Sequence, residues 1–130
     1  MIKAYLVGIS TQIENEDIEV KYRIVKGEET ILEKSILKEY KKPLVVTHAA
    51  LLILLKELGK LNEDDEVVVV INDPALNEQI RGTSTTKNRD VIKMANKVRD
   101  ELSKYKGTIS VKDISGNHEE LMEWNNQLKF

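Results

Sequence analysis

Residues 66–74 read Glu66-Val67-Val68-Val69-Val70-Ile71-Asn72-Asp73-Pro74. Five apolar residues in a row, followed by polar ones, are typical of a short strand that is buried on both faces. Ligands of open α/β sheets bind beyond the carboxyl ends of such strands, so Asp73 lies where a functional side chain is expected. Asp followed by Pro is also a favoured pair for the N-cap and first position of a helix. We therefore expect a buried strand ending at Asp73 and a short helix over residues 74–80.

The residues before this strand predict three antiparallel strands and a helix. The first strand spans residues 2–10. Residues 17–25 alternate apolar and charged side chains, which indicates a strand with one buried face, and residues 30–37 pair back after a turn. Residues 48–60 predict a helix with Thr47 as its N-cap, and the apolar run 51–55 predicts that most of its surface is buried. Strand, helix and strand in succession imply a right-handed crossover and a parallel pair.

The second half of the chain predicts two further helices and one strand. After the loop 82–86, apolar residues recur at three- and four-residue spacing, which predicts a helix that packs on the core. These residues are Val91, Met94, Ala95, Val98, Leu102 and Tyr105. A short strand over 108–113 and a helix over 119–128 complete the order β-β-β-α-β-α-α-β-α. We expect a single α/β domain over residues 1–130, with a mixed five-stranded sheet (three antiparallel strands, then two parallel ones) flanked by helices.

The composition excludes several classes of protein. With 130 residues, 41% hydrophobic and 32% charged, the chain is long enough to bury a core and is expected to be globular. The lack of cysteine excludes disulfides, zinc–thiolate sites and thiol catalysis. The first residues do not have the form of a signal peptide, and no apolar stretch approaches the ~18 residues of a membrane span. We expect a cytoplasmic protein that does not associate with membranes.

Basic residues are concentrated in one part of the chain. The net charge is −2, yet residues 86–106 contain seven basic and three acidic residues, so this segment carries +4 and the rest −6. Arg89, Lys93 and Lys97 recur at four-residue spacing and share one face of a helix, with Lys87 just before it. One interpretation is a solvated helix face with local ion pairs. The other is a surface that contacts phosphates through Lys87, Arg89, Lys93 and Lys97.

The order of elements resembles the ribonuclease H-like family, and four segments resemble that family in sequence. Thr47-His48-Ala49-Ala50-Leu51-Leu52 is similar to the start of its first helix, where Asn-Arg-x-Glu-Leu is usual. Val70-Ile71-Asn72-Asp73-Pro74 is similar to its fourth strand, which ends Thr-Asp-Ser. Thr86-Lys87-Asn88-Arg89-Asp90-Val91 is similar to the Lys-Asn-x-Asp-Leu opening of its long helix. Ile109-Ser110-Val111-Lys112 is similar to its last strand.

The resemblance implies a two-magnesium site built from four carboxylates, and the chain departs from that pattern. Val7 replaces the Asp of the first strand, and Ala50 replaces the Glu of the first helix. Asp113-Ile114 stands where Gly-His usually follows the last strand. The final Asp falls among Glu123, Trp124 and Asn125. Only Asp73 is clearly retained, so Asp73 is the candidate catalytic residue, and Asp73 and Glu123 are the candidate magnesium ligands.

Three functions follow as hypotheses. The first is a domain that has lost hydrolysis, needs no cofactor, and keeps weak binding to RNA–DNA hybrid or another duplex. The second is an active magnesium-dependent ribonuclease H, an endonuclease that cuts the RNA of a hybrid, in which nearby acids replace the missing carboxylates. These acids are Asp113, Glu119, Glu120 and Glu123. The third is a protein-interaction scaffold that has no nucleic-acid role.

Overall fold

The computed structural model describes residues 1–10, 17–39, 45–61 and 65–130. These residues form a five-stranded sheet with the strand order β3-β2-β1-β4-β5. The strands are β1 (Ile2–Ile9), β2 (Asp17–Lys26), β3 (Glu29–Glu39), β4 (Val67–Ile71) and β5 (Ile109–Asp113). β1 pairs antiparallel with β2, and β2 with β3, whereas β4 runs parallel to both β1 and β5. The predicted mixed sheet and the predicted order of elements are confirmed.

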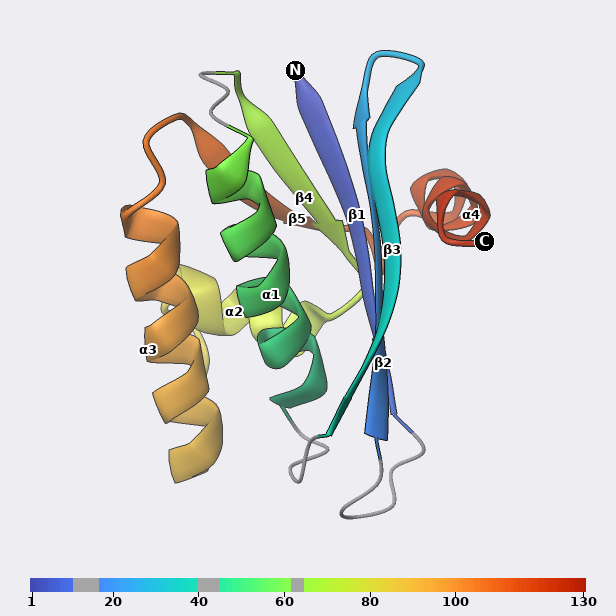
Figure 1. Cartoon of the computed structure of the whole chain (residues 1–130). Coiled ribbons are helices and arrows are strands. Elements are labelled where there is room, and N and C mark those ends of the chain that lie inside the picture. The colour runs from blue at the N-terminus through green and yellow to red at the C-terminus, as the bar shows by residue number, and fades with distance from the viewer. Residues whose placement is uncertain (11–16, 40–44, 62–64) are drawn as a thin grey trace.

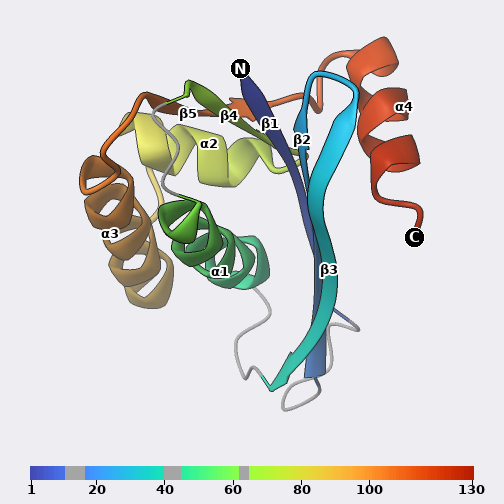
Figure 2. The same cartoon turned by 45° about the horizontal axis from the view of Figure 1, so that its top comes forward.

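The helices divide between the two faces of the sheet. They are α1 (Val46–Lys60), α2 (Pro74–Arg81), α3 (Arg89–Ser103) and α4 (His118–Gln127). Figure 1 shows α1, α2 and α3 together on one face, and α4 on the other. The turned view in Figure 2 shows the same separation. None of the helices in the described part of the chain has both the length and the apolar character needed to cross a bilayer.

Each face of the sheet has its own hydrophobic cluster. On the first face, the even-numbered residues Ile2, Ala4 and Leu6 of β1 pack with α1, as the alternation of side chains along a strand requires. On the second face, Tyr5 of β1 packs with Trp124 and other residues of the α4 side. The first cluster includes four residues of the predicted apolar stripe of α3, namely Met94, Val98, Leu102 and Tyr105. Val91, Ala95 and Val98 are buried, and Met94, Leu102 and Tyr105 are partly buried against the core.

Helix α1 begins earlier than the sequence predicts. Its N-cap is Val45, which makes no side-chain capping bond, so the prediction of Thr47 as N-cap was wrong. Val45 and Val46 are 0% and 6% exposed, and their burial sets the start of the helix. Val46 lies against Gly8, where an added Cβ would be only 2.8 Å from Val46 Cγ1 and 3.1 Å from its carbonyl oxygen. Gly8 therefore allows the close approach of α1 to the central strand.

Strands β1 and β4 separate before either of them reaches its end. β1 spans Ile2–Ile9, but it pairs with β4 only from Ile2 to Tyr5. Beyond Tyr5 the β4-facing backbone of β1 needs another partner, because buried carbonyl groups are almost always hydrogen-bonded. Trp124 of α4 supplies one, since its indole Nε1 donates to the Leu6 carbonyl at 3.0 Å. The divergence of the two strands thus fixes the position of α4.

Candidate functional site

Asp73 lies directly beyond the carboxyl end of β4, as the sequence predicts, and it caps α2. Its Oδ1 accepts a hydrogen bond from the backbone amide of Leu76 at 3.0 Å, and Pro74 occupies the first helical turn. The side chain is half-buried. The predicted cap is therefore present, and it uses one of the two oxygens of Asp73.

A second carboxylate lies beside Asp73. Asp113 ends β5 and is paired in register with Ile71 of β4. Its Oδ1 accepts from the backbone amide of Asp73 at 3.1 Å and from that of Ser115 at 3.3 Å. Its Oδ2 accepts from the Ser115 hydroxyl at 2.6 Å. Both oxygens of Asp113 thus have partners within the protein, and they tie the end of β5 to the end of β4.

Val7 and Ala50, the residues that the resemblance sets at carboxylate positions, lie on opposite faces of the sheet. Val7 packs against the cluster on the α4 side, together with Tyr5 and Trp124. Ala50 is 0% exposed and belongs to the cluster on the α1 side. Neither side chain has an oxygen that could bind a metal. The apolar surroundings of each would also make a charged replacement costly unless that charge were paired.

Trp124 determines which residues of α4 face the sheet. It is 8% exposed and lies with Tyr5, Val70 and Ile114 in the cluster on the α4 side. The sequence left Glu123, Trp124 and Asn125 as alternatives for the position of the family's final Asp. The structure places the indole of Trp124 against the part of β1 that diverges from β4. A single tryptophan on an amphipathic helix is the signal that could have indicated this inward-facing position.

Glu123 points to a different place. It accepts a hydrogen bond from the Tyr5 hydroxyl at 3.0 Å, and both residues line a cavity of about 570 Å³ that also includes Lys3 and Gln127. Burial, and then the hydrogen bond and charge of Glu123, raise the pKa of Tyr5 to about 12. Sequence reasoning missed this cavity, because it forms between segments that are more than a hundred residues apart in the chain.

These contacts decide how well the residues fit a metal. Two magnesium ions need several hard oxygen ligands, and the ends of β4 and β5 provide Asp73 and Asp113 as neighbours. Within residues 1–10, 17–39, 45–61 and 65–130, no three Asp, Glu or His residues are grouped so that they could hold a metal ion. In this part of the chain, Asp73 and Asp113 are thus the two carboxylates that lie together where the resemblance implies the metal site.

The two histidines lie apart from these carboxylates. His48 is 2% exposed in the first turn of α1, and its Nε2 is hydrogen-bonded to Gln79 Oε1 of α2. This contact joins the two helices within the core. His118 is exposed and begins α4, next to the N-cap Asn117, as the sequence indicates. Each histidine thus has a place in the structure that does not involve Asp73.

The basic residues singled out in the sequence lie on α3 and just before it. Lys87, Arg89, Lys93 and Lys97 are all exposed. Asn88 caps the helix, because its Oδ1 accepts from the amides of Asp90 at 3.0 Å and Val91 at 3.2 Å. This cap fixes the direction of the first turn, from which Arg89, Lys93 and Lys97 follow on one face. The arrangement can contact regularly spaced negative charges.

The whole fold is similar to solved structures of RNase H1 proteins. LC11-RNase H1, isolated from compost by a metagenomic approach, has a TM-score of 0.79 at 17% identity, over 98% of this chain and 91% of its own. RNase H1 from the halophilic archaeon Halobacterium salinarum NRC-1 has a TM-score of 0.72 at 17% identity, over 86% of this chain and 85% of its own. LC11-RNase H1 in complex with an RNA/DNA hybrid has a TM-score of 0.72 at 18% identity, over 92% of this chain and 90% of its own.

These similarities establish the fold of the chain. No protein-family model matches the sequence, and no curated protein matches it significantly. At sequence identities this low, structural likeness shows the architecture and leaves the activity to be argued from the site. The chain has the ribonuclease H-like fold, as the order of its elements predicts.

Proposed function

We propose that this domain binds RNA–DNA hybrid or another duplex nucleic acid weakly through α3, and that it has lost metal-dependent hydrolysis. The proposal combines a ribonuclease H-like fold with an exposed basic helix face and an apolar cluster around β1. We also infer that the protein is cytoplasmic, which the lack of cysteine supports.

The observation that carries the loss of hydrolysis is the packing around Val7. In the two-metal mechanism, the ions bind both the attacking water and the leaving oxygen of the phosphodiester, so every carboxylate that holds them contributes to the rate. Here Val7 and Trp124 belong to a hydrophobic cluster on one face, and Ala50 is fully buried on the other. Asp73 and Asp113 remain, and their oxygens accept backbone hydrogen bonds. Two such carboxylates are too few to hold both ions.

The basic face of α3 supports duplex binding. Residues Arg89, Lys93 and Lys97 follow one another at about 6 Å along the helix, since four residues rise about 1.5 Å each. A row of exposed cations along one helix face can contact several phosphates of a duplex backbone. A protein with this fold has been crystallised with an RNA/DNA hybrid, which makes a hybrid the first ligand to test.

One observation favours a second candidate function. Asp73 and Asp113 are direct neighbours, and Asp113 stands at a position that the resemblance does not require to be acidic. An active magnesium-dependent ribonuclease H with rearranged carboxylates would use this pair together with further acids of α4. Hydrolysis assays separate this candidate from the first.

The first experiment measures cleavage of a labelled RNA–DNA hybrid with magnesium and with manganese. We expect cleavage at background level, because Val7 and Ala50 supply no metal ligand. The control is the Asp73→Asn variant, which keeps the capping oxygen but removes the charge. Robust cleavage by the parent that disappears in this variant would refute the proposed loss and support the second candidate.

The second experiment measures binding to the same hybrid at several salt concentrations. Three or four phosphate contacts give a slope of log affinity against log salt of roughly −3 to −4. We expect the double variant Lys93→Glu/Lys97→Glu to abolish binding, and the matched control Lys3→Glu/Lys129→Glu, with the same change of charge, to retain most of it. Unchanged affinity in the α3 variant would show that this helix face is only solvated surface.

A further inference from the structure

A groove with an apolar floor runs between α1 and α3, and the end of β3 borders it through Lys38. It encloses about 380 Å³. Ala49, Leu52 and Ile53 of α1 form one side of the floor, and Met94 of α3 forms the other. Leu52, Ile53 and Met94 are only half-buried, so part of each side chain faces solvent. Figure 1 shows the two helices side by side with their axes in nearly the same direction.

The spacing of the lining residues matches the seat of a third helix. The groove is lined by residues 49, 52, 53 and 56 of α1 and by residues 94, 97 and 101 of α3. These are i, i+3, i+4 and i+7 on one helix and i, i+3 and i+7 on the other, so each stripe covers about 10 Å of helix axis. Two such stripes side by side form the kind of surface onto which an amphipathic helix packs its apolar face.

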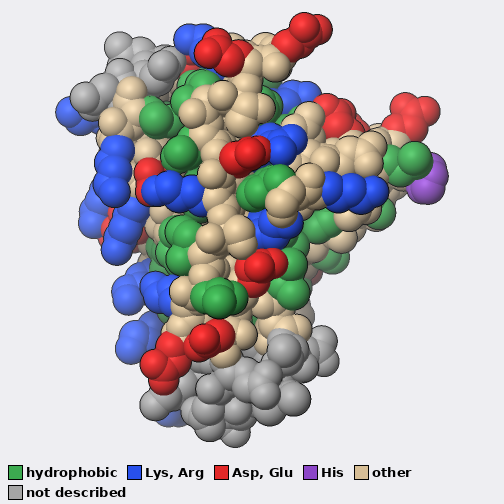
Figure 3. Space-filling model, turned by 45° about the vertical axis from the view of Figure 1, so that its right-hand side comes forward, with side chains coloured by type: hydrophobic (Ala, Val, Ile, Leu, Met, Phe, Trp, Pro, Cys, Tyr) green, Lys and Arg blue, Asp and Glu red, His purple; other side chains and the backbone are tan. Residues whose placement is uncertain are grey.

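The rim of the groove is basic. Lys38 of β3, Lys56 of α1 and Lys97 of α3 line it, and all three are exposed. Among the described residues that line the groove, Glu101 is the one acid, so three lysines stand against one carboxylate. Glu101 lies 3.5 Å from Lys104 Nζ, which also pairs with Asp100 at 3.1 Å. In Figure 3, Lys and Arg side chains gather along the left margin, with hydrophobic side chains beside them. The charge of the rim is complementary to an acidic ligand, and the apolar floor suits aliphatic side chains better than a phosphate backbone.

We propose that the groove between α1 and α3 binds an acidic amphipathic helix of a partner protein. Aliphatic side chains of the partner at positions i, i+3 or i+4, and i+7 fill the floor between Leu52, Ile53 and Met94. Glu or Asp residues that flank this apolar stripe contact Lys38, Lys56 and Lys97. The binding surface is separate from the ends of β4 and β5, and it shares only Lys97 with the basic face of α3.

The test uses a synthetic peptide as the probe. It has about 18 residues, which is five helical turns, with Leu at the helical spacing above, Glu beside the Leu stripe and Ala elsewhere. A peptide of the same composition in scrambled order lacks the stripe, and a third peptide carries Lys in place of Glu. Binding is measured by fluorescence anisotropy. We expect the acidic amphipathic peptide to bind and both other peptides to bind at least about tenfold more weakly.

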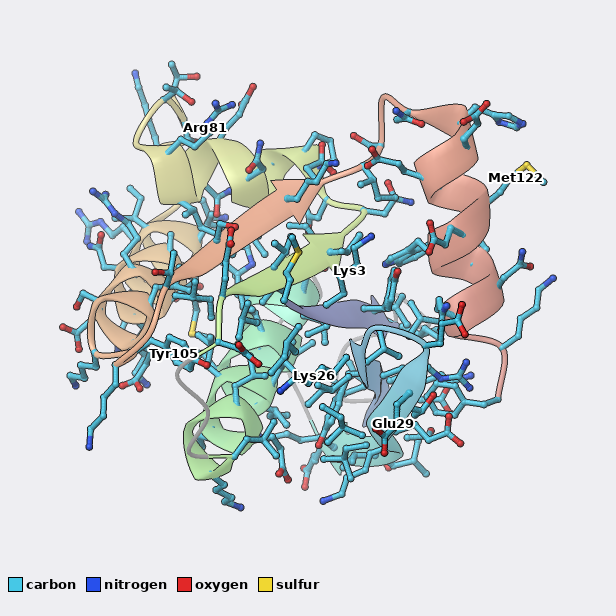
Figure 4. The ribbon with its side chains drawn as sticks, turned by 90° about the horizontal axis from the view of Figure 1, so that it is seen from above. Lys3, Lys26, Glu29, Arg81, Tyr105 and Met122 are labelled. Atoms are coloured by element: carbon cyan, nitrogen blue, oxygen red, sulfur yellow. The ribbon has the colours of Figure 1, made fainter. Side chains whose placement is uncertain are left out.

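Methionine methyl groups locate the binding site. Met94 lies in the groove, whereas Met122 is exposed on α4 and points away from the sheet in Figure 4. With isotope-labelled methionine methyl groups, we expect the peptide to shift the NMR signal of Met94 and to leave that of Met122 in place. The variant Met94→Leu assigns the signal without changing the apolar character of the floor.

Charge variants provide the decisive comparison. In Lys38→Glu/Lys56→Glu we expect the Kd of the acidic peptide to rise about tenfold, whereas Lys3→Glu/Lys129→Glu should leave it within about twofold. Failure of the acidic peptide to bind, or an equal loss in both variants, would overturn the proposal. Binding of a hybrid duplex that depends on Lys38 and Lys56 would also overturn it, because the groove would then belong to a nucleic-acid surface. If duplex binding depends on Lys93 but not on Lys38 and Lys56, the duplex and the peptide bind at different surfaces, and the groove proposal stands whether or not the proposed function does.

Discussion

Replacing Asp73 distinguishes a helix cap from a metal ligand. Among the described residues, the side chain of Asp73 has one hydrogen-bond partner, the backbone amide of Leu76, which donates to its Oδ1 at 3.0 Å. The contact to Asp113 uses the backbone amide of Asp73, so it survives any substitution that leaves the chain in place. The cost of Asp73→Ala is therefore that of one N-cap, about 1 kcal/mol in the free energy of unfolding. Asp73→Asn keeps an acceptor oxygen, so it should lower the free energy of unfolding by only a few tenths of the roughly 1 kcal/mol expected for Asp73→Ala.

Thermal melts convert these energies into measurable shifts. For a domain of this length, about 1 kcal/mol lowers the melting temperature by roughly 3–5 °C. We expect that decrease for Asp73→Ala, little change for Asp73→Asn, and no response of either variant or the parent to ~10 mM magnesium, a concentration at which a site of mM affinity would stabilise the fold.

A metal site would give a different pattern. Asp73 and Asp113 would then repel each other in the absence of metal, so that neutralising one of them would raise the stability of the metal-free protein. Magnesium would raise the melting temperature of the parent and leave that of Asp73→Asn unchanged. This pattern would refute the reasoning from the cap and reopen the case for an active enzyme.

Three further outcomes can be checked on the same protein. Gly8→Ala should lower the free energy of unfolding by about 1–3 kcal/mol in urea titrations, because the added Cβ would meet the side chain of Val46. A second change, Val46→Ala, should recover only part of the loss, since the added Cβ would also lie 3.1 Å from the Val46 carbonyl oxygen. Ala50→Glu should cost roughly 3 kcal/mol by the same measurement, because it places a carboxyl group in a fully buried position. Since the pKa of Tyr5 is raised from 10.0 to about 12, the unfolded chain loses this proton first, and stability should fall between those pH values. Glu123→Gln should lower that pKa, as followed by phenolate absorbance, and an unshifted titration would contradict the assigned role of Glu123.

Local patterns in the sequence predicted most of the fold. The alternation of residues 17–25 and the apolar run after Glu66 indicated strands, and the structure has β2 and β4 there. The pair Asp73-Pro74 predicted both the end of one element and the start of the next, and the capping bond to Leu76 confirms it. These signals depend on residues that are close in sequence, so one chain is enough to interpret them.

The parts that sequence reasoning did not predict depend on contacts between distant residues. The start of α1 is set by the packing of Val46 on Gly8, and no local capping signal reports that contact. The pairing of Asp113 with Asp73 depends on the register between β4 and β5. Helical periodicity shows that one side of α4 is apolar, but it does not say which residue meets β1. The hydrogen bond between Trp124 and Leu6 identifies this residue, and the two are 118 positions apart in the chain.

The position of Trp124 allows the docking of α4 to be followed separately from the unfolding of the helices on the other face of the sheet. It is the only tryptophan of the chain, and its indole is buried between α4 and the sheet. The emission spectrum of the protein therefore reports the docking of α4, whereas the far-ultraviolet circular dichroism also senses α1, α2 and α3. If the two signals follow the same denaturant curve, α4 unfolds together with the helical layer on the other face. A tryptophan transition at lower denaturant would identify α4 as a unit that detaches first, exposing Tyr5 and Val7 while the rest of the sheet stays folded.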